Sequence, residues 1–303
     1  LAATFPALQR ARALVGLGSV TAGVVSLTML MDVFPRGFRA RALAIYFLAG
    51  PLGAAIALNL GPPLAHATTW QTAFLAAGAP ALVLALASLT LPDPVRGLSE
   101  GVAVSQLRRH EFHGPSAEDY VDLMVNSSFT YSVFGLTFTA FAIGAANAWL
   151  PTFLAGVRGL PGPLAAAFAG ALAPAAAATG ILVGAWLADL RGRTDPRAYF
   201  LVPALAAAAA VPCWLVAFLG PNHPWQPAAL FATIALASAV LAPCYAILAS
   251  VAAPNMRGVA CGAAAAVVHL LGEAWAPRLM GWAAESFGQP DMMATTLGRV
   301  LAL

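Results

Sequence analysis

The sequence has no lysine and few charged residues of any kind. Charged side chains make up 9% of the 303 residues, and apolar residues make up 60%. Soluble domains carry about 25% charged and roughly 45–50% apolar residues, so the composition excludes an ordinary soluble fold. All fifteen basic side chains are arginine. This bias indicates a GC-rich coding sequence and favours a bacterial source.

Cysteine is also scarce, and the chain offers little to bind a metal. Cys213, Cys244 and Cys261 each lie inside an apolar stretch without paired spacing, which does not support a disulfide framework or a zinc site. His110 and His113 are one helical turn apart, but two ligands on a solvated segment are more often polar surface. We therefore predict no metal site and no cofactor.

Long apolar runs dominate what remains. A helix needs about 20 residues to cross ~30 Å of hydrocarbon, and runs of that length recur along the whole sequence. They lie near 11–33, 40–62, 70–91, 128–155, 163–188, 198–219, 227–251 and 258–284. Because polar residues do not alternate along them, they fit helices rather than barrel strands. The sequence predicts an all-α integral membrane protein with eight full transmembrane helices.

Both ends of the sequence look incomplete. The first residue is Leu1 rather than Met, and the last stretch, 291–303, is too short to span a membrane. We therefore expect the chain to be a fragment of a longer protein.

Arginine gathers in every second connection between the predicted helices. The arginines in this alternating set are Arg36, Arg39, Arg41, Arg96, Arg108, Arg109, Arg191, Arg193, Arg197 and Arg257. The intervening connections hold only Arg158. Because cytoplasmic loops collect positive charge, we expect the chain to start outside and the 92–127 connection to be cytoplasmic. The interpretation is a multi-pass protein of a bacterial inner membrane.

The connection at 92–127 divides the chain into two similar parts. Pro35 to Gly53 and Pro254 to Gly272 have the same separation, and each runs from an Arg-bearing turn into the next helix. The predicted domains are 1–91 and 128–303, joined by the 92–127 linker. Two parallel repeats of this kind are typical of transporters that rock one half against the other.

Several short segments resemble major facilitator transporters, in the order found in that family. They are Arg12-Ala-Leu-Val-Gly16-Leu-Gly18, Asp32-Val-Phe-Pro35 with Arg39-Ala-Arg41, Gly50-Pro51-Leu52-Gly53, Trp70-Gln-Thr-Ala-Phe74, Pro94-Val-Arg96-Gly97, Trp149-Leu-Pro151-Thr-Phe153-Leu, Ala188-Asp189-Leu-Arg191-Gly192-Arg193 and His269-Leu-Leu-Gly272-Glu273-Ala-Trp-Ala-Pro277. The last is most similar to Spinster-like members. The resemblance implies a helical bundle containing helices four to eleven of twelve and the beginning of the twelfth.

Four residues inside the predicted helices are candidates for substrate binding or coupling. Arg12 would need a partner or water in the membrane, although it could instead extend to the outer headgroups. Ser19 stands where the Spinster resemblance implies a proton-coupling acid, which puts that route in doubt. His269 and Glu273 share a helix face and could sense protons or form a structural pair. We expect both to point into the bundle.

The resemblance also implies a conformational latch at the cytoplasmic helix ends, built from acid–base contacts. Its members would be Asp32, Arg39, Arg41, Asp189, Arg191 and Arg193. Small residues predict close helix contacts, because they allow backbones to approach in lipid. These positions are Gly16, Gly18, Gly50, Pro51, Gly53 and Gly272. Gly50-Pro51 also resembles a shortened antiporter motif, which favours export.

Together these features predict a secondary transporter of a small anionic or amphipathic, lipid-like organic solute, with protons as a candidate coupling ion. The predicted partners are the solute and the lipid bilayer, with no nucleic acid and no second subunit. Two alternatives remain open: a truncated remnant that does not transport, and a metal-dependent intramembrane hydrolase that would use His269 and Glu273.

Overall fold

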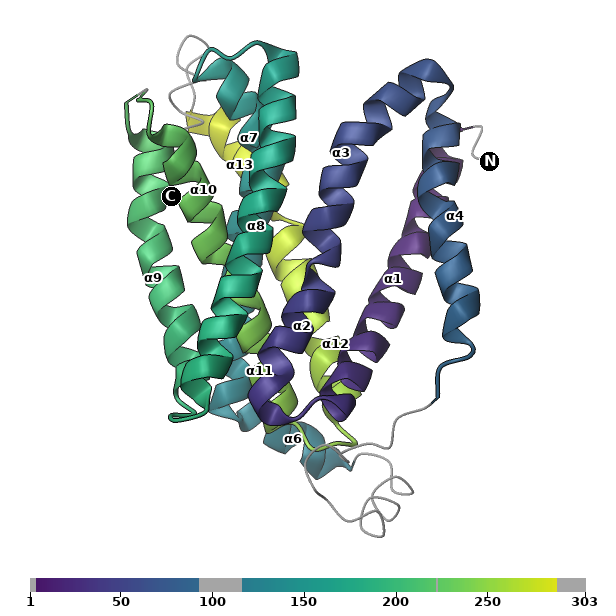
Figure 1. Cartoon of the computed structure of the whole chain (residues 1–303), viewed down its shortest axis with the longest axis vertical. Coiled ribbons are helices and arrows are strands. Elements are labelled where there is room, and N and C mark those ends of the chain that lie inside the picture. Colours follow the sequence, from purple (N-terminus) through teal and green to yellow (C-terminus); the bar gives the residue numbers. More distant parts are fainter. Residues whose placement is uncertain (1–3, 93–115, 222, 288–303) are drawn as a thin grey trace.

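The computed structural model describes residues 4–92, 116–221 and 223–287, and these fold into helices joined by short connections (Figure 1). Eight of its helical segments are long and apolar enough to cross a membrane. They are Phe5–Val33, Arg36–Ala67, Trp70–Ser88, Ser127–Gly156, Gly162–Gly192, Ala198–Leu219, Gln226–Val251 and Arg257–Ser286. The predicted all-α class and the eight spans are confirmed.

Five of the spans are single helices. They are α1 (Phe5–Val33), α4 (Trp70–Ser88), α7 (Ser127–Gly156), α8 (Gly162–Gly192) and α9 (Ala198–Leu219). The amphipathic helix α6 (Ala117–Val125) precedes α7 and begins with a capping box between Ser116 and Asp119. Residues 93–115 lie outside the described part, so the prediction for His110 and His113 is not addressed there.

Three spans are built from several helical segments. The short η1 (Arg36–Phe38) leads into α2 (Arg39–Phe47), which joins α3 (Ala49–Ala67), and α10 (Gln226–Ser238) joins α11 (Leu241–Val251). The last span contains α12 (Arg257–Val267), the π-helical segment η3 (Val268–Glu273) and α13 (Ala276–Phe287). In η3 the Ala274 N–H donates to the His269 carbonyl at 2.9 Å, one residue further back than in an α-helix.

The connections α1–α2, α8–α9 and α11–α12 lie together at one end of the molecule, the lower end in Figure 1. We call this the Arg-rich end, because most arginines of the alternating set gather there. The N-terminal segment (α1–α4) meets the C-terminal segment (α7–α13) largely toward this end. There α2 packs against α8 and α11, and α1 packs against α12. Further from this end, α3 also contacts α8.

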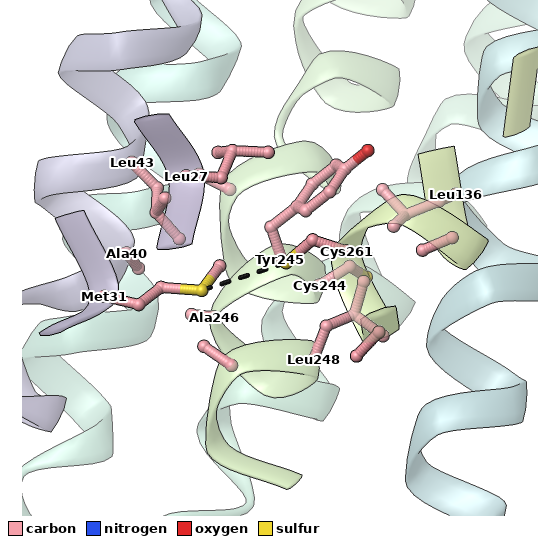
Figure 2. Packing of buried hydrophobic residues seen from close by; sticks show 14 of the residues in the cluster. Leu27, Met31, Ala40, Leu43, Leu136, Cys244, Tyr245, Ala246, Leu248 and Cys261 are labelled. Atoms are coloured by element: carbon pink, nitrogen blue, oxygen red, sulfur yellow. Dashed lines mark hydrogen bonds between the residues drawn. The ribbon is translucent and has the colours of Figure 1, made fainter. Parts of the chain in front are cut away.

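A buried apolar cluster joins the two segments near the Arg-rich end (Figure 2). Met31 of α1 and Leu43 of α2 contribute from one side, and Tyr245 of α11 and Cys261 of α12 contribute from the other. The Cys261 Sγ lies 3.9 Å from the Met31 Sδ. Cysteine therefore serves here as a small packing residue, as expected for a buried thiol.

The C-terminal segment has its own close helix contact, where α8 meets the break between α10 and α11. A Cβ added to Gly180 would overlap the carbonyl oxygen of Ala235, and one added to Gly184 would overlap that of Ala239. Small residues four positions apart let backbones approach closely in lipid. The sequence analysis did not identify this pair.

Candidate functional site

A buried ion pair joins the two segments at the Arg-rich end. The Arg257 guanidinium, at the start of α12, donates to Asp32 near the end of α1. Only 1% of the Arg257 side chain and 6% of the Asp32 side chain are exposed. Asp32 was predicted as a latch residue, but its arginine partner was not. Because both charges are withdrawn from solvent, each depends on the other and on nearby hydrogen bonds.

Arg39, another predicted latch residue, makes hydrogen bonds to the α1–α2 turn. It is buried, and its Nε and Nη2 donate to the Met31 carbonyl at 3.2 and 2.9 Å. Arg39 Nε also donates to the Phe34 carbonyl at 3.2 Å, so these bonds hold the α1–α2 turn within the N-terminal segment. Arg257 makes the matching contact in the second repeat, where its Nε donates to the Ala249 carbonyl at 3.3 Å. In both cases the arginine reaches back eight residues to a backbone carbonyl. Because every residue carries such a carbonyl, this spacing left no signal in the sequence.

A second polar contact joins α8 to the beginning of α2. Asp189 is fully buried and accepts from the Arg41 backbone N–H and from Arg41 Nε, each at 3.0 Å. The carboxylate thus lies at a helix N-terminus, where unpaired N–H groups and the helix dipole favour negative charge. The predicted latch residues Asp189 and Arg41 are therefore in direct contact across the two segments.

Tyr199 of α9 completes this contact and was missed by the sequence analysis. Its hydroxyl lies 2.7 Å from Asp189 Oδ1 and 3.1 Å from the Arg36 carbonyl. No sequence motif marked this tyrosine.

The other two predicted latch arginines lie at the surface of the same end. The Arg193 guanidinium lies 5.2 Å from the centre of the Phe38 ring, and Arg41 lies 4.7 Å from the same ring. Phe38 is thus approached by cations from both segments, within the range of cation–π attraction. Arg191 is exposed, and its guanidinium has no partner within the described residues.

His269 and Glu273 form a pair on η3. His269 Nδ1 lies 2.8 Å from Glu273 Oε2, and the two side chains are 50% and 52% exposed. Glu273 also packs on α7, since a Cβ added to Gly144 would stand 3.9 Å from Glu273 Cγ. We expected both side chains to point into the bundle. The described structure places them half exposed beside α7, and their direction relative to the bundle stays a prediction.

Arg12 and Ser19 are exposed on α1, whereas the pair on η3 is formed by His269 and Glu273 with each other. Among the described residues, the Arg12 guanidinium has no hydrogen-bond or ion-pair partner. The structure therefore gathers the predicted latch residues at one end, where only Asp189 and Arg41 pair with each other, and it does not bring the predicted coupling residues into one cluster.

Only some of the predicted packing residues lie at close helix contacts. A Cβ on Gly272 would stand 2.8 Å from the Thr137 carbonyl oxygen, which confirms a close contact between η3 and α7. The described residues form no such contact at the other four glycines, where a Cβ would meet nothing within 4 Å: Gly16, Gly18, Gly50 and Gly53. Those four are on faces of α1 and α3 that no described helix covers, and neighbouring Pro51 is half-buried.

Away from the Arg-rich end, Arg158 is the one arginine that the intervening connections hold. Its Nη2 donates to the carbonyls of Ala217 and Gly220 at 3.1 and 3.0 Å, so the side chain caps the C-terminus of α9. Burial lowers the pKa of Arg158 below its ordinary value. Arginine nevertheless stays protonated in proteins, so the cap keeps its charge.

Comparison with known proteins gives a consistent result. The sequence model of the Major Facilitator Superfamily matches residues 1–277. Human protein spinster homolog 3 is 30% identical over 285 residues, an alignment that covers 89% of this chain and 55% of the human protein. The mouse homolog is 31% identical over 287 residues, with the same coverage of 89% and 55%. The chain thus spans about half the length of these curated relatives.

Solved structures show the same fold. A bacterial homologue of the human lysosomal transporter Spinster, in an inward-facing and unoccupied conformation, has a TM-score of 0.56 at 20% identity. That comparison covers 91% of this chain and 70% of the other. The fucose:proton symporter of E. coli has a TM-score of 0.64 at 16% identity, covering 92% and 70%.

Proposed function

The chain belongs to the major facilitator superfamily, and we propose that it contributes to secondary transport of a small anionic or amphipathic organic solute by alternating access. The superfamily consists of membrane transporters, so the hydrolase alternative is set aside. The remaining question is which residues carry the transport cycle.

The observation that carries this proposal is the pair of polar contacts between the segments. Asp32 with Arg257 and Asp189 with Arg41 link α1 to α12 and α8 to α2 at the same end of the molecule. Alternating access requires an interface that can close and open as a unit. Ion pairs suit this role because they lose their mutual attraction but regain hydration when they separate. In this proposal they hold the Arg-rich end closed.

Arg12 is the proposed binding residue for the anionic group of the solute. A guanidinium within a membrane span is costly unless water or an anion accompanies it, and Arg12 has no protein partner among the described residues. Arginine also binds carboxylate and phosphate through two parallel hydrogen bonds. His269 and Glu273 are proposed to exchange the coupled proton, with export as the direction.

A second candidate is a chain that does not transport by itself. It is favoured by the coverage of about half of each relative and by the open faces around Gly16, Gly18, Gly50 and Gly53. The two candidates differ in whether purified chain moves solute.

The test is transport by the full chain reconstituted into liposomes. We would load the vesicles with single-chain alkyl phosphates, fatty acids or sugar acids and follow their release. For at least one class of anion, the proposal predicts faster release than from liposomes that carry the same anion but contain no protein. Arg12→Gln should abolish that release, while Arg10→Gln should preserve it as the matched control. No release of any class would support the second candidate.

Sidedness has a separate test. If the Arg-rich end is cytoplasmic, a cysteine at Gly37 should react with an impermeant thiol reagent only in inside-out vesicles. Labelling of intact cells would reverse the proposed orientation.

A further inference from the structure

Tyr199 occupies a place where three elements of the Arg-rich end meet. It begins α9, its hydroxyl contacts the Asp189 carboxylate at the end of α8, and the same hydroxyl contacts the Arg36 carbonyl in the other segment. We propose that Tyr199 is a positioning residue of the transport cycle, which orients Asp189 toward Arg41 and so favours closure of the Arg-rich end. The proposal rests on the alternating-access function proposed above.

The two carboxylate oxygens of Asp189 accept from different donors. Asp189 Oδ2 accepts both bonds from Arg41, and Oδ1 lies 2.7 Å from the Tyr199 hydroxyl. This is the usual O–H to O distance, and bonds to a charged acceptor are the stronger kind. A buried carboxylate with both oxygens bonded has one preferred orientation. Without the hydroxyl, Oδ1 loses its described donor, and the carboxylate can rotate away from Arg41.

The Tyr199 hydroxyl also makes a contact with the N-terminal segment, at the Arg36 carbonyl. The phenolic group has a single hydrogen, which Asp189 attracts more strongly than a neutral carbonyl because the carboxylate is charged. The 3.1 Å approach to the Arg36 carbonyl therefore adds a weaker, shared contact that exists only while the two segments are together. Opening the Arg-rich end would separate Tyr199 from Arg36 but leave it beside Asp189.

The aromatic ring of Tyr199 packs against Gly192. A Cβ added to Gly192, the last residue of α8, would stand 2.5 Å from Tyr199 Cε2. The space that glycine leaves is thus filled by the aromatic ring. Gly192→Ala should push the ring aside and provide a second way to displace the hydroxyl without removing it.

The experiment measures opening directly and needs no solute. Ala40 is fully buried in the cluster that joins the segments. In full-length chain whose native cysteines are replaced by alanine, Ala40→Cys should react with a soluble maleimide only when the Arg-rich end opens. Tyr199→Phe should accelerate this labelling about three- to tenfold, because the closed state alone loses the ordered approach of Asp189 to Arg41 and the contact with the Arg36 carbonyl, together worth about one hydrogen bond. Gly192→Ala should accelerate it in the same direction.

Two controls separate positioning from a general loss of stability. Tyr131→Phe alters a tyrosine that is 73% exposed on α7 and should leave the labelling rate unchanged. In an Asp189→Asn background, Tyr199→Phe should add less than twofold, because its action passes through the carboxylate. Unchanged labelling in Tyr199→Phe, or a full acceleration in the Asp189→Asn background, would overturn the proposal. Accelerated labelling in a chain that releases no solute would retain it and remove the transport function alone.

Discussion

Removing one member of the buried pair between Asp32 and Arg257 should destabilise the protein strongly. Arg257→Gln leaves the Asp32 carboxylate in a place where only 6% of its side chain is exposed. Breaking a buried pair on one side costs about 3–5 kcal/mol, because the remaining charge stays desolvated without its partner. Asp32→Asn should cost a similar amount, since it leaves a guanidinium that is 1% exposed.

The double variant provides the decisive comparison. Asp32→Asn with Arg257→Gln leaves no isolated charge, and an amide pair can still hydrogen-bond, so its loss should be smaller than the sum of the single losses by at least about 1.5 kcal/mol. The assay is equilibrium unfolding in mixed micelles with increasing mole fraction of SDS, followed by tryptophan fluorescence. Additive losses would refute the reasoning, because they would mean that the two charges do not depend on each other.

Three further predictions concern other parts of the fold. Gly180→Leu should lower the unfolding free energy by at least about 1–3 kcal/mol in the same assay, since its side chain would overlap the backbone of Ala235; a neutral result would contradict the close contact. Arg158→Gln should cost about 1–3 kcal/mol by removing charged hydrogen bonds to carbonyls at the end of α9, and unchanged stability would argue against the cap. Glu273→Gln should abolish the pH dependence of solute release between about pH 5 and 8 without preventing solute binding; a pH profile identical to that of the parent would make the pair structural.

The number and approximate limits of the spans could be predicted because they depend on composition alone. The predicted helix near 198–219 coincides with α9, and the one near 128–155 differs from α7 by one residue at each end. Membrane thickness determines how long an apolar run must be, and the run itself is visible in the sequence.

The breaks within spans could not be predicted in the same way. Hydropathy records which side chains stand in Val268–Glu273 but not how many residues each turn holds, so it cannot distinguish a π-turn from an α-turn. The break between α10 and α11 lies against Gly184, whose close approach to Ala239 is a tertiary contact. Both features come from packing between helices that are distant in sequence.

The partners of the charged residues were only half predictable. Motif resemblance selected Asp32, Asp189 and Arg41, because they stand in short segments that resemble family motifs. It did not select Arg257 or Tyr199, since their roles arise when α12 and α9 are brought beside the N-terminal segment and α8. A resemblance can indicate which acids matter, but the pairing requires the fold.

The π-turn of η3 separates two helices of the last span, and each of them has its own fixed rotation against a neighbouring helix. Before η3 in the chain, the contact of Arg257 with Asp32 fixes the rotation of α12 against α1. After η3, the Pro277 carbonyl accepts a hydrogen bond from Trp149 Nε1 at 3.0 Å, which fixes the rotation of α13 against α7. A π-turn holds one more residue than an α-turn. Deleting Leu270 would therefore let η3 become a regular α-helical turn while both flanking helices keep their rotation. The Asp32 contact and the Trp149 contact would then both be retained. A single-residue deletion in this segment should thus be tolerated better than one in the middle of α8, which would turn everything beyond it by about 100°.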